Sequence, residues 1–280
     1  MNKIIQSGTL LFALLISNMT MAGSLSDNSL SQLMALSGLN KQAAQIPGLV
    51  QAGVAQARQQ GAAMPNDEFA EVQKSIGSAF STSEFLNTVG SEINKNVSEK
   101  DAKELFSWYK SSLGKRITQA EENASTPAAY QEMMKQAQSL LADKKRLMLA
   151  KEIDSLVDVS GMTMNIQENT GVAVYTAISS AMNPGKPVNI KPYMDQMAAQ
   201  KQQMSANIKQ LVLVSFIYSY KNIKIANLKK YITFLKKSST KRLNDSVIKG
   251  MLNAFNQSTN KMAKSLAVTF KKFADKKNKK

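Results

Sequence analysis

The sequence predicts an all-α protein built from two tandem related helical modules, and three observations lead to this prediction. Apolar residues recur at helical spacing along most of the chain. No stretch alternates apolar and polar residues convincingly, as a half-buried strand would. The segment from Trp108 to Ile117 returns in weaker form at residues 234–243, which is 126 positions later. We therefore expect a duplication of one helical module.

Residues 1–22 are typical of a signal peptide. Lys3 gives a positive start, Leu10 to Ile16 form a short apolar run, and small residues lead to an expected cleavage after Ala22. The run is about half of the roughly 20 residues that a spanning helix needs, so a retained anchor is the less favoured alternative. No later stretch is long and apolar enough to span a membrane. We expect a periplasmic protein, with secretion as the alternative.

The chain contains neither cysteine nor histidine. Disulfides, thiol catalysis and a lipid-modified cysteine are thereby excluded. The usual zinc ligands and a Ser-His-Asp triad are excluded as well. We predict no metal site and no cofactor, and any catalysis would have to use carboxylate, lysine, serine or tyrosine side chains.

Capping signals predict the helices of module 1, residues 23–150. Pro47 should kink the second helix, because proline removes a backbone donor. Gly114 should end the helix that contains Tyr109 by adopting a left-handed conformation. A bend near Asp143 is one alternative for the end of the module, and a single long helix is the other. Helix starts are predicted at Ser26-Asp27, Leu39, Asn66, after Ser81, at Ser98 (as a capping box with Asp101), near Lys115 and at Thr126-Pro127.

Module 2, residues 151–275, breaks at residues 183–187 and has its most buried helix at Leu211 to Tyr220. A long amphipathic helix follows from about Ile248 to Phe273, and a lysine-rich tail occupies residues 276–280. Two further segments keep the order of the repeat: Leu33 to Leu39 returns at residues 156–162, and positions 135–145 return at 261–271. Whether the two modules pack separately or interlock is left open by these patterns.

The first copy of the repeat carries a motif made of Phe106, Tyr109, Ser111, Gly114 and Lys115. Together with Glu121 and the Leu36-Ser37-Gly38 opening, this motif resembles the signature of a bacterial exported family catalogued as domain of unknown function 2059. The resemblance covers about residues 28–150 and implies an exported, all-helical domain whose activity is unassigned. Ser112 stands where that family usually has proline, and Thr240 replaces the glycine in the second copy.

Two interpretations of this motif are open. The structural one is a sharp turn between two helices, in which Trp108 packs in the core or at its rim. The functional one is an anion site at the start of the next helix, where Ser111, Ser112, Lys115 and Arg116 would surround free backbone amides.

Nearly all of the formal net charge of +16 lies in the last 60 residues, which hold 17 Lys and Arg but 2 Asp and Glu. Lysines on the polar face of an amphipathic helix bind anionic lipid or another polyanion. We expect an anionic phospholipid or lipopolysaccharide surface, or an envelope protein, as the partner; a solvated face is the alternative. Nucleic acid is disfavoured by export and by the few interleaved aromatics. The candidate residues are Lys229, Lys230, Lys236, Lys237, Lys241, Arg242, Lys261, Lys264, Lys271 and Lys272.

A cell-wall hydrolase is the enzymatic alternative, because it would need only a pair of carboxylates. Glu121 and Glu122 are candidates, but neighbouring helical residues point about 100° apart. No phosphate-binding glycine loop is present in the sequence either. We therefore favour a non-catalytic binding or interaction protein, and two facing carboxylates in a pocket would argue against it.

Overall fold

The computed structural model describes residues 25–59, 66–183 and 186–277. The predicted all-α class is confirmed, since these residues form helices and no strand. Among the described helices, none combines the length and the apolar character that a membrane crossing requires. The predicted leader and the last lysines of the tail lie outside the described residues. So do Gly61 and Pro65, which the sequence predicts to end the second helix.

Four helices of the first half begin where their capping side chains predict, whereas the helix predicted to start near Lys115 begins at Ser112. Ser26, Ser81, Ser98 and Thr126 each accept a hydrogen bond from a backbone amide of the first turn, and Asp101 completes the capping box with Ser98. The chain divides at Asp143, so the bend rather than the single long helix is observed. The elements are α1 (Asp27–Leu36), α2 (Leu39–Gln59), α3 (Asn66–Gly77), α4 (Thr82–Asn96), α5 (Glu99–Tyr109), α6 (Ser112–Ala124), α7 (Pro127–Ala142) and α8 (Lys144–Val157).

The second half consists of fewer and longer helices. They are α9 (Val159–Met182), α10 (Lys191–Ser219), α11 (Ile225–Leu235) and α12 (Ser238–Lys277). In α10 the C-terminal part is buried, as predicted for Leu211 to Tyr220, whereas most of residues 191–207 are exposed. The amphipathic helix predicted from Ile248 begins ten residues earlier, at Ser238, because the second copy of the motif already contains its first turn.

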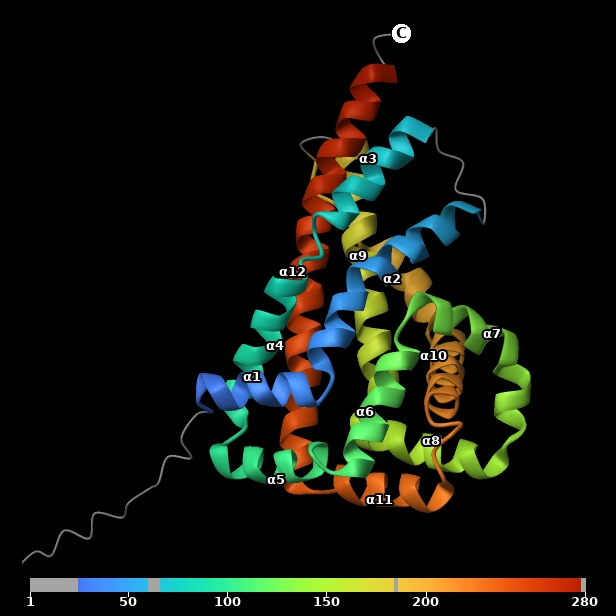
Figure 1. Ribbon diagram of the computed structural model, residues 1–280. Coiled ribbons are helices and arrows are strands. Elements are labelled where there is room, and N and C mark those ends of the chain that lie inside the picture. Colours follow the sequence, from blue (N-terminus) through green and yellow to red (C-terminus); the bar gives the residue numbers. More distant parts are fainter. Residues whose placement is uncertain (1–24, 60–65, 184–185, 278–280) are drawn as a thin grey trace, which may run out of the picture.

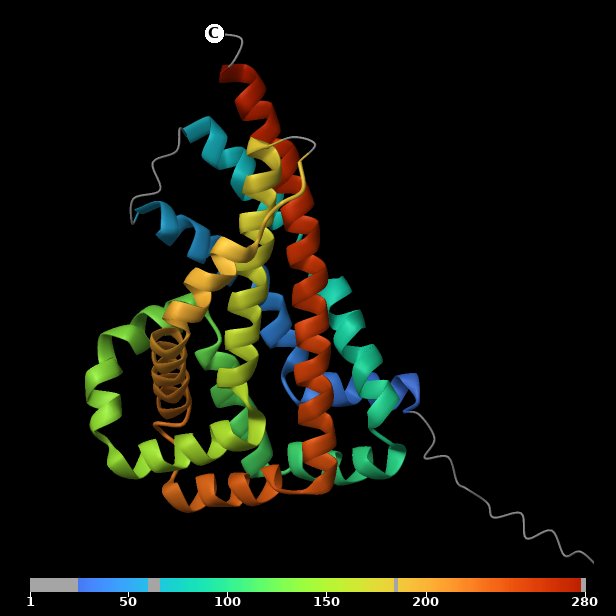
Figure 2. The same cartoon turned by 180° about the vertical axis from the view of Figure 1, so that it is seen from behind.

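The molecule has a broad base and a narrow upper end (Figure 1). At the base, α5, α8 and α11 lie across the direction of α12, which runs from the base to the upper end. The view from behind shows α9 beside α12, and the two helices pack together along much of their length (Figure 2). The upper end is formed by α3, the end of α9 and the C-terminal turns of α12.

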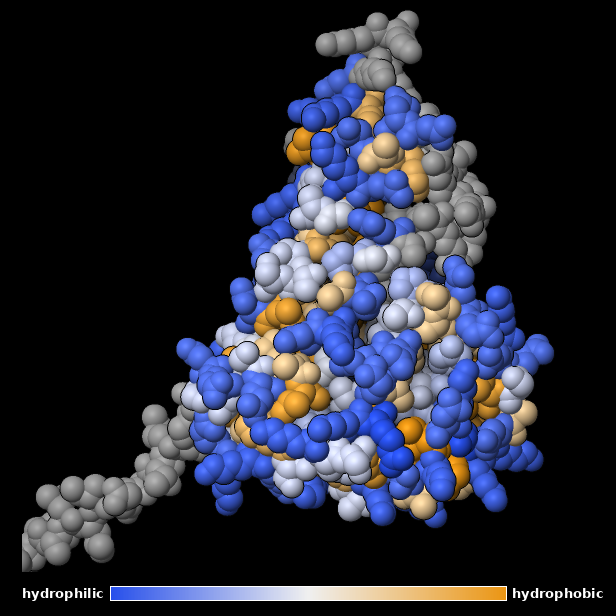
Figure 3. All heavy atoms as spheres, viewed as in Figure 1, coloured by the Kyte–Doolittle hydropathy of each residue, from blue (hydrophilic) through white to orange (hydrophobic). Residues whose placement is uncertain are grey.

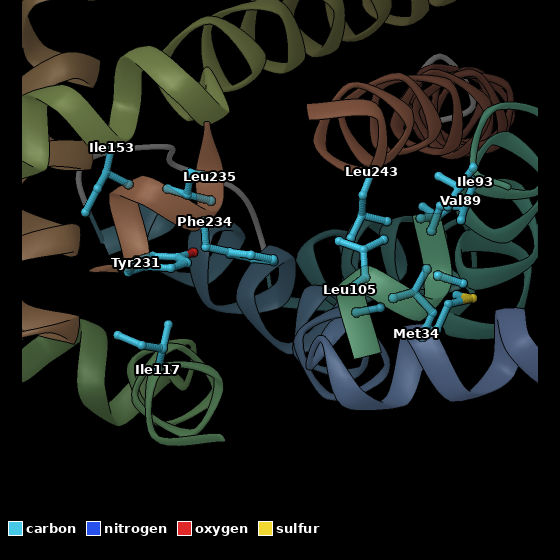
Figure 4. Packing of buried hydrophobic residues seen from close by; sticks show 14 of the residues in the cluster. Met34, Val89, Ile93, Leu105, Ile117, Ile153, Tyr231, Phe234, Leu235 and Leu243 are labelled. Atoms are coloured by element: carbon cyan, nitrogen blue, oxygen red, sulfur yellow. The ribbon is translucent and has the colours of Figure 1, made fainter. Parts of the chain in front are cut away.

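The two halves of the chain share one main core. Helix α12 packs against α4 of the first half, and α10 packs against α6. Figure 4 shows Leu243 of α12 pointing at Leu105 of α5, beside Val89 and Ile93 of α4. The same cluster continues through Ile117, Ile153, Tyr231, Phe234 and Leu235. The halves are therefore interlocked, with the long helix of one inserted among the helices of the other.

The repeated segment has the same helix boundaries in both halves. Helix α5 ends at Tyr109 and α11 at Leu235, and the next helices start at Ser112 and Ser238, each pair 126 positions apart. Each of these two helix–turn–helix connections is called a corner below. The repeat does not extend to every segment: Ser37 and Gly38 form a turn, with Gly38 at φ +79°, whereas Ser160 and Gly161 lie in the first turn of α9. The duplication of a whole module therefore stays a prediction.

Candidate functional site

The family-like motif forms the corner between α5 and α6. The Ser111 hydroxyl donates to the Trp108 carbonyl at 2.6 Å and accepts from the Gly114 amide at 3.0 Å. Ser111 is thus the N-cap of α6, and its side chain ties the last turn of α5 to the first turn of the next helix. The Ser111 hydroxyl is fully used in this local structure.

The predicted role of Gly114 is wrong. Helix α5 ends five residues before it, at Tyr109, and Gly114 lies buried in the first turn of α6 without a positive φ angle. The glycine is needed for another reason: a Cβ atom here would lie 2.1 Å from the Trp108 carbonyl oxygen. The corner is tight because two backbones approach closely, and the second corner accommodates Thr240 at the matching position.

The two aromatic residues of the motif, Phe106 and Tyr109, make packing contacts. Phe106 is half-buried beneath Lys110, whose Nζ lies 4.9 Å from the ring centroid. Tyr109 meets the Phe234 ring edge-on at 5.8 Å. Lys115 is exposed and, like Arg116, forms no ion pair with the described residues. The geometry supports the structural interpretation of this motif over the anion site.

A polar cluster inside the base was not recognised from the sequence. The Glu121 carboxylate of α6 accepts hydrogen bonds from the Tyr220 hydroxyl at 2.6 Å and the Tyr231 hydroxyl at 2.9 Å. Burial raises the pKa of Glu121, although these two hydrogen bonds act in the opposite direction. Burial and the nearby Glu121 also raise the pKa of Tyr109. The sequence signal was weak, because the three tyrosines lie far apart in the chain, in α5, directly after α10 and in α11.

Four of the ten predicted cationic residues are held by carboxylates of the first half. Lys236 pairs with Glu152 at 2.7 Å, and Lys261 pairs with Glu84 at 2.6 Å. Lys237 pairs with Glu104 at 2.8 Å, and Arg242 pairs with Asp101. These cations fasten α11 and α12 to α4, α5 and α8. They are therefore less available to an external anion than a freely solvated lysine would be.

The other six are exposed and form no ion pair with the described residues. They lie at opposite ends of the molecule, because α11 and the start of α12 are at the base and the end of α12 is at the top (Figure 1). A rise of 1.5 Å per residue separates positions 241 and 264 by roughly 35 Å. The basal group is Lys229, Lys230 and Lys241, and the distal group is Lys264, Lys271 and Lys272.

The distal lysines share one face of α12 with Val268, which is 57% exposed. Positions 264, 268, 271 and 272 follow the helical period, so their side chains leave the helix within about one quarter of a turn. Asp275 is the one acidic residue on this arc among the described residues. We call Lys264, Val268, Lys271 and Lys272 the distal stripe. In Figure 3 hydrophilic side chains cover most of the face shown, with small hydrophobic areas between them.

A groove of about 1480 Å³ opens at the base between the α4–α5 connection and the start of α12. Arg242 Nε lies 3.0 Å from Asp101 Oδ2, and Ser239 donates to Glu104 at 2.5 Å. These contacts cross from α12 to α5. The groove is lined by Ser91, Asn94, Lys95, Asn96, Val97, Ser98, Lys100, Asp101, Glu104, Lys237, Ser238, Ser239 and Arg242.

Two carboxylates thus line a groove, as a hydrolase would require. Their positions and their pKa values, however, are not those of a catalytic pair. Asp101 and Glu104 lie on the same helix and the same wall. Hydrogen bonding to Arg242 lowers the pKa of Asp101 to about 2, and hydrogen bonding to Lys237 lowers the pKa of Glu104. A general acid needs a raised pKa. Glu121 has one, but it does not line the groove.

The fold is that of an all-α protein whose central feature is the α5–α6 corner. Residues 93–143, which include this corner, match the model of a family described as "Uncharacterized protein conserved in bacteria (DUF2059)". The resemblance predicted from the motif is confirmed for this segment, which is narrower than the predicted range of 28–150. No curated protein and no solved structure matches the chain.

Proposed function

We propose that this protein is exported to the periplasm, has no catalytic role and attaches to an anionic envelope surface through the distal stripe. The sequence of residues 1–22 supports export. The pKa directions in the groove support a role without general acid catalysis.

The observation that carries the proposal is the combination of free lysines and an exposed apolar side chain on one helical face. Each near-surface lysine contributes about 1 kcal/mol to binding an anionic membrane at moderate salt. Lys264, Lys271 and Lys272 together would therefore raise the affinity by roughly two orders of magnitude. Val268 adds an apolar group at the position where a lipid surface would contact the helix.

The position of the stripe fits surface attachment. It lies on the last turns of α12 at the narrow upper end, away from the shared core at the base (Figure 1). Residues can therefore be changed there without disturbing the contacts of α12 with α4 and α5. Truncation at residue 221 is unsuitable as a test, because it would remove α11 and α12 from the core.

The test is co-sedimentation with vesicles of phosphatidylglycerol or of phosphatidylcholine over a salt series. The distal variant carries Lys264→Gln, Lys271→Gln and Lys272→Gln, and the control carries Lys229→Gln, Lys230→Gln and Lys241→Gln, so both lose the same charge. We expect salt-sensitive binding to phosphatidylglycerol that falls by roughly 100-fold in the distal variant and changes little in the control. Equal losses in the two variants, or no binding by the wild type, would contradict the proposal.

Lipopolysaccharide offers the same phosphate chemistry as anionic phospholipid. A parallel series with lipopolysaccharide aggregates distinguishes the two sources. Binding to one of the two alone identifies the surface. In either case the distal variant must bind more weakly than the wild type for the binding to be assigned to the distal stripe.

A further inference from the structure

We propose that the groove between the α4–α5 connection and the start of α12 binds an acidic segment of peptide chain. This site is separate from the distal stripe, and the inference does not depend on the proposed function. Its walls come from the two halves of the chain. Asp101 of α5 binds Arg242 of α12, and Glu104 of α5 binds Lys237, which directly precedes α12. The site is preformed, which lowers the entropic cost of binding.

The charge of the lining favours an anionic ligand. Four cations, Lys95, Lys100, Lys237 and Arg242, face two carboxylates. Both carboxylates are engaged by cations, so neither is available to a cationic ligand. Lys95 also binds Glu92, whereas Lys100 is exposed and forms no ion pair with the described residues. Three of the four cations are thus paired with carboxylates, and the excess positive charge of the groove is that of Lys100.

The neutral lining favours a peptide among anionic ligands. The Asn94 side-chain oxygen is buried, and it accepts no hydrogen bond in the described part of the chain. A buried acceptor without a donor costs about 1–3 kcal/mol, and a turn of the Asn94 side chain toward the groove would let a peptide N–H remove that cost. No aromatic side chain lines the groove, so neither a sugar ring nor a base has a surface to stack on.

The size of the groove favours a chain segment over a small molecule. Pockets for small ligands typically have volumes of about 300–1000 Å³. This groove measures about 1480 Å³ and is open to solvent. An extended segment with glutamate or aspartate side chains would place carboxylates near Lys100 and main-chain amides near Asn94.

The test measures fluorescence anisotropy of short labelled peptides with the full-length mature protein. One peptide alternates glutamate with glycine, and the other has glutamine in place of glutamate. We expect the acidic peptide to bind more tightly, and Lys100→Glu to weaken it about tenfold. Lys103→Glu is the matched control, because Lys103 is exposed on the same helix and does not line the groove.

A second variant separates ligand binding from folding. Asn94→Leu removes the acceptor without leaving a polar atom unpaired, so we expect weaker peptide binding and an unchanged or raised free energy of unfolding. The distal variant should bind the acidic peptide normally, which keeps this test independent of vesicle binding. Equal affinity for the two peptides, equal effects of Lys100→Glu and Lys103→Glu, or no binding of either peptide would overturn the inference.

Discussion

Trp108 and Phe234, which occupy matching places 126 positions apart in the two corners, stack on each other with ring centroids 4.4 Å apart and planes 8° apart. Each ring belongs to the last turn of its helix, α5 or α11. The repeated segments are therefore not independent copies on separate domains. They contact each other at the centre of the base, where Tyr231 also stacks on Trp108.

This stack predicts a single unfolding transition. Trp108 is the only tryptophan, so its fluorescence reports on the contact between the halves. Because both halves contribute to one core, urea curves followed by tryptophan fluorescence and by far-ultraviolet circular dichroism should coincide. Two separate transitions would show that the halves unfold independently.

Replacing Phe234 with leucine should lower the free energy of unfolding by about 2 kcal/mol, because the variant loses both buried area and the stacked aromatic pair. Thr233→Ala is the control, since Thr233 is exposed on the same helix. Urea titration of the two variants provides the comparison. A Phe234→Leu protein as stable as the control would show that the stack contributes little.

Local signals in the sequence predicted most of the fold. The capping serines and Thr126-Pro127 mark helix starts because their hydrogen bonds lie within one turn of the chain. The interlocking of the halves was not predictable in the same way. It depends on contacts such as Leu105 with Leu243, whose helical periodicity shows that both are buried but not which partner each one meets.

The close approach of two backbones at the α5–α6 corner predicts that Gly114 cannot be replaced without a loss of stability. Gly114→Ala should destabilise the protein by about 2–3 kcal/mol, because the added methyl group overlaps the Trp108 carbonyl. Gly48→Ala is a matched control within a helix, since nothing lies within 4 Å of a Cβ at that position. Alanine there should stabilise by up to about 1 kcal/mol, because it favours the helix. Thermal unfolding of both variants provides the test, and equal effects would refute the close-approach explanation.

The candidate sites were less predictable than the fold. Periodicity placed Lys264, Lys271 and Lys272 correctly on one exposed face, since this depends on a single helix. Periodicity could not show that Lys237 and Arg242 are bound by carboxylates more than 100 positions away. The tyrosines around Glu121 were missed for the same reason, because a polar cluster within a helical core has no sequence spacing of its own.

Because Glu121 is buried, we expect its contribution to the free energy of unfolding to fall as the pH rises, which is the opposite of the usual behaviour of a paired surface carboxylate. Its pKa is raised in the folded protein, so its contribution to stability is greatest below the unfolded value and is lost as the pH rises through the folded value. Glu121→Gln keeps an acceptor for Tyr220 and Tyr231 but cannot ionise. The variant should therefore gain stability relative to the wild type as the pH rises from about 4 towards neutrality.

Chemical denaturation of wild type, Glu121→Gln and Glu121→Leu at several pH values checks this prediction. The leucine variant leaves two tyrosine hydroxyls without their acceptor and should be about 1–3 kcal/mol less stable than Glu121→Gln at every pH. A stability difference between wild type and Glu121→Gln that does not change with pH would show that the carboxylate is not desolvated.

The ion pair between Asp101 and Arg242 should stabilise the protein at neutral pH and fail in strong acid. The pKa of Asp101 is lowered from 3.8 to about 2, so its contribution is present above about pH 4 and is lost as the pH falls through about 2. A shift of this size corresponds to about 1–2 kcal/mol once it is reduced for the half-exposed Arg242. Asp101→Asn should cost this amount at pH 7 and nearly nothing near pH 2.

Asp195→Asn, which breaks an exposed pair with Lys191, should change stability by less than about 0.5 kcal/mol at pH 7. If the two variants behave alike in denaturant titrations at pH 7, the buried position of Asp101 gives its ion pair no advantage over a surface pair.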